Sequence, residues 1–187
     1  MAAERTAAVV LAAGLSRRFG SDKLLHPFEG KPLAGHIADT LAALPLAHRL
    51  AVCPAGNPHR AELFAARGFE VLLNPEPARG MGASLALAAR RAADLSATAM
   101  LVCLADMPAV TAAHLVRLMA AEGDAVATET AGIATPPALF RRALFPALSA
   151  LTGGRGARDL LSGATLVPAP PGMTRDSDVP ADLSPAR

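Results

Sequence analysis

The sequence predicts an α/β domain in which a doubly wound, mostly parallel sheet carries helices on both faces. Two observations predict this fold. Short runs rich in Val, Leu and Ala alternate with patterns of helical length along most of the chain, as in successive βαβ units. The chain of 187 residues also combines 52% hydrophobic with 18% charged residues, which indicates a folded domain with its own core. We therefore expect a single domain over residues 1–187, in which about residues 175–187 form a C-terminal tail.

Each expected strand is a short apolar run, and the strands follow one another at residues 6–12, 49–53, 69–73, 98–104, 125–128 and 165–167. The expected helices lie between or after these strands, at residues 33–44, 58–67, 83–94, 114–121, 136–151 and 156–161. Individual residues support these bounds. Pro32 and Pro58 occupy first-turn positions of helices, and Thr111 has a hydroxyl that can cap the helix beginning at residue 114.

The charge and the cysteines narrow the classes of partner. A net charge of +2, with no block of like charges and with Phe as the only aromatic type, argues against a nucleic-acid partner. The apolar run at residues 7–13 is too short to span a membrane. Cys53 and Cys103 lie far apart between apolar residues, which predicts buried, reduced thiols and a cytoplasmic setting.

The basic residues are distributed unevenly between types. The chain has 16 Arg but only two Lys, Lys23 and Lys31, and both lysines lie in one stretch near the N-terminus. Coding bias explains such a skew without assigning a function, but it makes a retained lysine notable. The five histidines, His114 among them, show no paired metal-ligand spacing, so we expect solvated or capping roles for them.

Ligands bind a doubly wound sheet at the carboxyl ends of its strands, so the loops after the first, third and fourth strands are the candidates for a site. The first of these loops reads L-A-A-G-L-S-R-R-F-G-S-D-K at residues 11–23. Small residues at 12–14 let backbone N–H groups approach an anion, and Arg17 and Lys23 add positive charge. The loop is not a P-loop, because Pro32 follows Gly30-Lys31. A plain turn with surface basic residues fits it equally well.

The other two loops are also unusual. The second reads N-P-E-P-A-R-G-M-G-A-S-L at residues 74–85; its glycines suggest a dinucleotide fingerprint, but Leu85 occupies the third glycine position. A flexible loop leading into a helix fits it as well. In the third loop Asp106 follows the strand two residues before Pro108, where a carboxylate can bind Mg²⁺ together with substrate phosphates. A turn-forming Asp is the simpler interpretation of that residue by itself.

These stretches together resemble the sugar-phosphate-type nucleotidyltransferases. The first loop is similar to L-A-A-G-x-S-x-R-x-G-x-x-K followed by G-x-P-L at residues 30–33, with Phe19 where Met is usual. Residues 74–85 resemble N-x-x-x-x-x-G-M-x-x-S-L, residues 104–108 resemble L-x-D-x-P, and residues 176–183 resemble D-x-D-x-P-x-D-L. The nearest branch is that of the molybdenum-cofactor nucleotidyltransferases, or MobA-like NTP transferases. Within it, Ala-Ala-Gly and the Leu-Leu after Lys23 are more similar to the cytidylyltransferases than to the guanylyltransferases.

The resemblance implies a Rossmann-like fold of the nucleotide-diphospho-sugar transferase type and a Mg²⁺-dependent reaction. The enzyme would transfer CMP from CTP to the phosphate of molybdopterin or the molybdenum cofactor and release pyrophosphate. A molybdoenzyme or its insertion chaperone would be a partner, whereas nucleic acid and membrane would not.

The resemblance also implies roles for individual residues. Nucleotide binding would involve Leu11, Ala12, Ala13, Gly14, Arg17, Lys23, Asn74, Gly80, Gly82 and Ser84. Catalytic roles would belong to Arg17, Lys23 and Asp106, and the metal would be bound by Asp106 with Asp178, or with Asp176 in place of Asp178.

The acceptor side departs from the family pattern. In the related cytidylyltransferases a G-x-P element usually opens the helix expected near Pro136-Pro137, but here residues 132–135, which end at Thr135, precede the prolines. In the later G-D-x-G-A-R pattern, Gly154 replaces the Asp. These departures leave the identity of the acceptor open. The choice between CTP, GTP and another NTP is also open from the sequence. The arginines that can bind an anionic acceptor, unless they are solvated, are Arg141, Arg142, Arg155 and Arg158. The alternatives are a non-catalytic cofactor-binding or insertion module and an NTP transferase for another phosphorylated small molecule.

Overall fold

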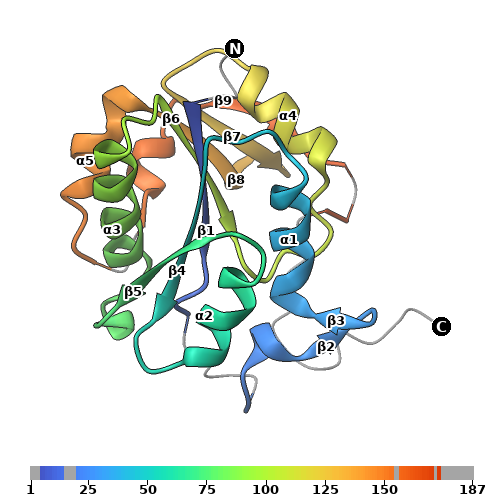
Figure 1. Cartoon of the computed structure of the whole chain (residues 1–187). Coiled ribbons are helices and arrows are strands. Elements are labelled where there is room, and N and C mark those ends of the chain that lie inside the picture. Colours follow the sequence, from blue (N-terminus) through green and yellow to red (C-terminus); the bar gives the residue numbers. More distant parts are fainter. Residues whose placement is uncertain (1–4, 15–19, 154–155, 171, 174–187) are drawn as a thin grey trace.

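The computed structural model describes residues 5–14, 20–153, 156–170 and 172–173. Its main sheet has seven strands in the order β5-β4-β1-β6-β8-β7-β9 (Figure 1). Their bounds are β1 (Thr6–Leu11), β4 (His48–Pro54), β5 (Glu70–Asn74), β6 (Ala99–Leu104), β7 (Ala125–Thr130), β8 (Ile133–Arg141) and β9 (Thr165–Pro168). Every strand of this described sheet is parallel except β8, which pairs antiparallel with β6 and β7. The predicted doubly wound, mostly parallel fold is confirmed.

The helices cover both faces of the sheet, as Figure 1 shows. They are α1 (Leu33–Ala42), α2 (Pro58–Ala65), α3 (Met81–Asp94), α4 (Ala112–Ala120) and α5 (Phe145–Ser149). Helices α1, α2 and α4 pack on one face, and α3 and α5 pack on the other. Thr111 caps α4, as predicted, by accepting a hydrogen bond from the backbone N–H of His114. Among the described residues, no helix has the length and apolar character that crossing a membrane requires.

Shorter elements connect these layers. A separate two-stranded ribbon is formed by β2 (Pro27–Phe28) and β3 (Lys31–Pro32) and leads into α1. Four 3₁₀ turns lie in the described chain: η2 (Lys23–Leu25), η3 (Pro77–Arg79), η4 (Arg142–Leu144) and η5 (Arg158–Leu161). The helix expected at residues 156–161 is therefore wrong in type, because this segment forms only the short 3₁₀ turn η5.

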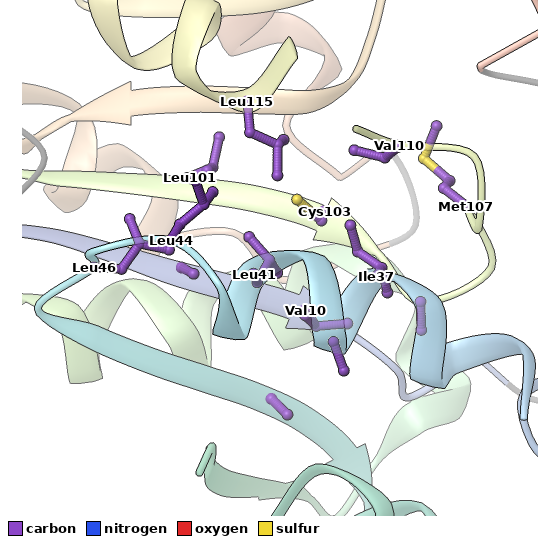
Figure 2. Packing of buried hydrophobic residues seen from close by; sticks show 14 of the residues in the cluster. Val10, Ile37, Leu41, Leu44, Leu46, Leu101, Cys103, Met107, Val110 and Leu115 are labelled. Carbon is purple, nitrogen blue, oxygen red and sulfur yellow. The ribbon is translucent and has the colours of Figure 1, made fainter. Parts of the chain in front are cut away.

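The central strand β1 is buried on both faces. Val10 lies in the core beneath α1, whereas its neighbour Val9 lies in the core beneath α3, because successive side chains of a strand point to opposite faces. Figure 2 shows Val10 in the first of these cores together with Ile37 and Leu41 of α1 and Cys103 of β6. A strand buried on both sides reads as a continuous apolar run, which is why residues 6–12 were recognisable as a strand.

The helix expected at residues 136–151 is wrong. Strand β8 occupies its first part, and only Phe145–Ser149 is α-helical. Pro136 and Pro137 suggested a helix start, but they lie within β8, where the pairing with β7 skips from Ala127–Ala138 to Thr128–Thr135. The irregularity accommodates two residues without an N–H donor. The following residues are buried between β6 and β7, so tertiary pairing overrides the local helical pattern.

Candidate active site

The candidate site lies at the carboxyl ends of β1 and β6, which are neighbours in the sheet. The chain leaves β1 through α1 on one face and reaches β6 through α3 on the other face. The two strands therefore flank the topological switch point, where the loops diverge and leave room for a ligand. The backbone N–H of Ala105 donates to the carbonyl of Leu11 at 3.2 Å, so the two loops begin side by side.

Two of the predicted catalytic side chains meet at this point. Lys23 is only 6% exposed, and its Nζ donates a hydrogen bond to Oδ2 of Asp106 at 2.9 Å. The side chain of Asp106 is 29% exposed, so its carboxylate is also open to solvent. A cation and a carboxylate in contact at the switch point can bind the two kinds of charge that a metal–nucleotide complex carries. Arg17, Asp176 and Asp178 lie outside the described residues.

The backbone after β1 offers hydrogen-bond donors. Ala12 and Ala13 are buried, and Gly14 is exposed. Within the described part of the chain, the N–H groups of Ala13 and Gly14 donate no hydrogen bond. A Cβ added at Gly14 would meet no heavy atom of the described residues within 4 Å. Unpaired N–H groups beside a lysine are typical of an anion-binding loop, although contact of residues 11–14 with a nucleotide stays a prediction.

A buried arginine that sequence reasoning missed lies behind this loop. Nη1 of Arg60, which belongs to α2 and is 4% exposed, donates to the carbonyl oxygens of Ala12 at 2.6 Å and Gly14 at 2.7 Å. Its Nε donates to both carboxylate oxygens of Asp22, at 3.0 and 2.8 Å. No motif marks Arg60, because the described partners of its side chain include two backbone oxygens and a residue 38 positions away. Only the fold brings them together.

Asp22 connects this arginine to the turn that carries Lys23. One of its oxygens accepts a hydrogen bond from the N–H of Leu24 and caps η2, and the other accepts from Nδ2 of Asn57. Burial alone would raise the pKa of Asp22, but the hydrogen bond and charge of Arg60, with the Asn57 and Leu24 bonds, outweigh it and lower the pKa below 3.8. Asp22 is therefore ionised at neutral pH.

The loop after β5 is held by its own side chains. Asn74 and Ser84 are both buried; Nδ2 of Asn74 donates to Oγ of Ser84 at 3.0 Å, and Oδ1 of Asn74 accepts from the N–H of Glu76. Gly80 has φ +96°, a conformation that favours glycine. A Cβ at Gly82 would lie 2.3 Å from the carbonyl oxygen of Gly153. Each of these four predicted nucleotide-binding residues thus has a structural role, and their contact with base or ribose stays a prediction.

A cavity of about 800 Å³ opens next to these loops, on the α3 face of the sheet. Its walls come from the ends of β1 and β6, the start of α3, strand β8 and the segment around η5. Most lining residues are apolar, such as Leu11, Leu104 and Phe140. Arg158 is the one charged residue among the described residues that line it. The cavity can therefore hold an organic ligand of moderate size that carries an anionic group.

Two of the arginines considered for the acceptor lie elsewhere. Arg141 pairs with Ala99 at the start of β6, at the opposite end of this strand from the candidate site, and its Nη2 donates to the carbonyls of Met119 and Ala121 near the end of α4. Arg142 follows directly and donates to the carbonyl of Ala97. The suggestion that these two bind the acceptor is therefore wrong; Arg142 is exposed, as the solvated alternative expects, and Arg141 is partly buried. Arg158 lines the cavity, and Arg155 lies outside the described residues.

The remaining metal-binding and nucleophilic residue types do not form a second centre in the described residues, where no three His, Cys, Asp or Glu cluster to hold a metal ion. The role of Asp106 as a metal ligand stays a prediction. Cys53 and Cys103 are buried and free, as predicted. Burial raises the pKa of Cys53 to about 12 and also raises that of Cys103, so both thiols stay protonated at neutral pH.

The fold and the site define a nucleotide-dependent transferase, and comparison with known families agrees. The model of the MobA-like NTP transferase domain matches residues 8–169. The chain therefore belongs to the MobA-like NTP transferase family and is a nucleotidyltransferase.

Individual proteins extend this comparison. The purine catabolism protein PucB of Bacillus subtilis is 31% identical over 194 residues, which cover 96% of this chain and 94% of PucB. A probable molybdenum cofactor guanylyltransferase of Pyrococcus horikoshii is 37% identical over 83 residues, covering 43% of this chain and 42% of that protein. The structure of Rv0371C from Mycobacterium tuberculosis in complex with manganese superposes with a TM-score of 0.78 at 22% identity and covers 95% of each chain. This last likeness shows the shared fold.

Proposed function

We propose that this nucleotidyltransferase transfers CMP from CTP to the phosphate of a molybdopterin-type acceptor, with release of pyrophosphate. The observation that carries the proposal is the contact between Lys23 and Asp106 beside the open backbone donors of residues 13–14. The relative named as a molybdenum cofactor guanylyltransferase supports the acceptor class. The preference for CTP over GTP rests on the Ala-Ala-Gly form of the first loop and on the Leu-Leu that follows Lys23.

The reaction needs positioning and charge neutralisation more than proton transfer. An oxygen of the acceptor phosphate attacks the α-phosphorus of the nucleotide, the bond to the β-phosphate oxygen breaks, and pyrophosphate leaves in line. The attacking phosphate is already ionised, so no general base is required. The ammonium group of Lys23 and the N–H groups of Ala13 and Gly14 bind the nucleotide phosphates and offset the repulsion between two anions. We assign Arg17 the same role, from the family pattern.

The ion pair between Lys23 and Asp106 keeps both charges neutralised before the nucleotide and the metal bind. Each side chain neutralises the other, so neither charge is left unpaired at the partly buried end of the sheet. When a nucleotide binds, its phosphates replace Asp106 as the partner of the Lys23 ammonium group. The carboxylate of Asp106 is then available to a cation. Asp106, together with Asp178 or Asp176, would hold Mg²⁺, which supplies charge neutralisation of the reacting phosphates when bound.

The cavity beside the loops is the place we assign to the acceptor. Its apolar walls suit a flat organic ring system, and Arg158 suits an anionic substituent. It begins at Leu11 and Leu104, the last residues of the two strands that carry the phosphate loop and Asp106, so an acceptor in it would lie next to the triphosphate.

Measurement of pyrophosphate release tests the proposal. The purified full chain is mixed with Mg²⁺ and each of ATP, GTP, CTP and UTP, with and without molybdopterin. We expect release only with a nucleotide and molybdopterin together, and fastest with CTP. Preferential release with another base would overturn the CTP assignment. Release of pyrophosphate with a sugar 1-phosphate in place of molybdopterin would overturn the assignment of a molybdopterin-type acceptor. Binding of nucleotide or molybdopterin without turnover in any combination would favour the insertion module.

A further inference from the structure

We propose that Arg60 is a positioning residue for the nucleotide phosphates: its guanidinium group shapes both halves of the anion site without touching the substrate. The inference rests on the proposed function in one respect, since it takes the loop at residues 12–14 and Lys23 as the triphosphate site. Three sets of contacts support it, namely those with the loop carbonyls, with Asp22 and with α2.

The contacts with the loop orient its peptide groups. A carbonyl oxygen that faced the site would repel phosphate, so an anion-binding loop needs its N–H groups forward and its carbonyl groups back. Nη1 of Arg60 binds the carbonyl oxygens of Ala12 and Gly14, and the guanidinium is buried. The N–H groups of Ala13 and Gly14 carry no hydrogen bond in the described chain. The arginine thus holds two oxygens on the protein side of the loop.

The contact with Asp22 extends the same control to Lys23. Nε of Arg60 binds both oxygens of Asp22, and Asp22 caps the turn η2, in which Lys23 is the first residue. One guanidinium group therefore connects the backbone donors after β1 with the turn that places the lysine. Asp22 also cancels the charge of Arg60, so the cluster contributes orientation and adds no net charge to the site.

Helix α2 makes this support rigid. Asn57 caps the helix by accepting a hydrogen bond from the backbone N–H of Arg60, and its Nδ2 donates to Asp22. Leu63 and Phe64, one turn further along α2, are buried in the core. Arg60 therefore extends from a capped and packed helix, and a site supported in this way is held more precisely than one on a loop alone.

Lysine cannot replace arginine in this arrangement. Arg60 uses Nη1 for two carbonyl oxygens and Nε for a carboxylate, and these donors point in different directions from one planar group. The ammonium group of a lysine is a single point, so it keeps the charge but cannot reach all of these acceptors. Arg60→Lys therefore separates the charge of the residue from its geometry.

The test compares Arg60→Lys with the same change at Arg67. Arg67 follows Ala66, the C-cap of α2. Its Nε binds Asp39 at 2.7 Å and its Nη1 donates to the carbonyl of Leu63, so it forms a comparable ion pair with a different partner. Binding of CTP with Mg²⁺, and of inorganic tripolyphosphate with Mg²⁺, is measured by calorimetry on the full chain. Thermal unfolding of each variant is recorded in parallel.

We expect Arg60→Lys to weaken binding of both ligands by about 10- to 100-fold, as loss of a supporting contact does at other charged sites. Tripolyphosphate has no base, so an equal loss for the two ligands places the effect at the phosphates. Arg67→Lys should leave both affinities within about twofold of the wild type, a change too small to signify a lost contact. A purely structural role for Arg60 predicts the opposite result: a lower unfolding temperature with both affinities unchanged, which would overturn the inference.

Failure of a variant to fold and failure of the proposed reaction are distinguished from failure of the inference about Arg60. If Arg60→Lys does not fold, the double variant Arg60→Met with Asp22→Asn removes both charges together and leaves neither buried alone; it should still lose the same affinity, and normal binding would refute the inference. If the wild type binds both ligands but never releases pyrophosphate, the proposed reaction fails while the role of Arg60 is still decided by binding. If the wild type binds neither ligand, the proposed phosphate site itself is wrong.

Discussion

At the scale of single residues, the two lysines of the chain differ in what they contact. Lys23 is buried and pairs with Asp106 at the ends of β1 and β6. Lys31 is partly exposed and pairs with Asp39, whose other oxygen binds Arg67. The first pair lies at the carboxyl ends of the strands, whereas the second joins β3 to α1, and Arg67 adds the region after α2 to it. Lys31 is therefore a natural control for the proposed role of Lys23.

We predict that Lys23→Ala lowers the rate of pyrophosphate release by at least about 100-fold, as loss of a preorganised charge contact does, whereas Lys31→Ala retains most of the activity. Circular dichroism and thermal unfolding verify that both variants fold. Equal activities in the two variants would show that Lys23 does not bind the phosphates.

A parallel change tests the carboxylate. Asp106→Asn keeps the size of the side chain and its hydrogen bond acceptor for Lys23, but it removes the charge that a cation requires. We expect a loss of at least about 100-fold in turnover with nucleotide binding in the absence of metal close to that of the wild type. Retention of full activity at saturating Mg²⁺ would exclude Asp106 as the metal ligand.

His114 shows how far a single residue can depart from its sequence expectation. A solvated or capping role is wrong for this side chain, because it is 1% exposed. The hydroxyl of Thr128 donates to the carbonyl of Pro137 at 2.8 Å, so Nε2 of His114 must donate to Thr128 Oγ1, at 2.9 Å. Nδ1 then has no proton, and it has no partner in the described chain. Burial, and secondly the charge of Arg117, lower the pKa of His114 below 6.5.

This environment predicts acid sensitivity. Below pH 6.5 the unfolded chain binds a proton at His114 while the folded chain still does not, so the free energy of unfolding falls as the pH is lowered toward the folded-state pKa. The slope from one such proton cannot exceed about 1.4 kcal/mol per pH unit. In urea unfolding between pH 7.5 and 5.5, His114→Gln should show a shallower dependence. His59→Gln, at an exposed position, should follow the wild type; identical profiles for all three proteins would contradict the assignment.

At the scale of elements, the start of α3 depends on a close backbone contact. The N–H of Gly82, in the first turn of α3, donates to the carbonyl of Gly153 at 3.1 Å. First-turn N–H groups have no partner inside their own helix, so an acceptor from a distant segment satisfies this one. The contact also brings the segment near Gly153 against the helix that borders the cavity.

We predict that Gly82→Ala destabilises the protein by about 1–3 kcal/mol, because the added Cβ would lie 2.3 Å from a backbone oxygen and force the two segments apart. Gly56→Ala, at a position where a Cβ meets nothing within 4 Å, is the control and should be close to neutral. Chemical denaturation measures both. A Gly82→Ala protein as stable as the control would mean that the segment at Gly153 yields without cost.

The elements also show where sequence patterns succeed. The strands at residues 6–12 and 98–104 were predicted because a strand buried on both faces is apolar at every position, and α2 and α4 because their proline and threonine stand at the starts of helices. The prediction of a helix at residues 136–151 was wrong because the local pattern carries no information about the strands that pair with this segment. Strands β6 and β7, distant in the sequence, supply the hydrogen bonds that make it a strand.

At the scale of the whole molecule, binding a ligand at the switch point should stabilise the complete fold. The candidate site is formed by the ends of β1 and β6 and by the turn η2, and Arg60 connects α2 to it. A nucleotide bound there would therefore stabilise the contacts between these elements. We predict that CTP with Mg²⁺ at 100 times its dissociation constant raises the free energy of unfolding by about 2.7 kcal/mol.

Thermal unfolding at several CTP concentrations measures this effect. Lys31→Ala should show the same increase in Tm as the wild type, and Lys23→Ala a much smaller one at the same concentrations. An increase in Tm with CTP that is equal in all three proteins would place the nucleotide away from Lys23.

The sequence by itself determined the mostly parallel α/β architecture, the family and the loops of the candidate site. Those features depend on local information, since buried strands, helix starts and short motifs are written in neighbouring residues. The tertiary structure alone decided that Lys23 meets Asp106, that Arg60 binds the carbonyl oxygens of the loop after β1, and that Arg141 and Arg142 lie near the amino end of β6, away from that loop. Such contacts join residues tens of positions apart, often through backbone oxygens that are the same in every residue, so no pattern of side chains along the chain could reveal them.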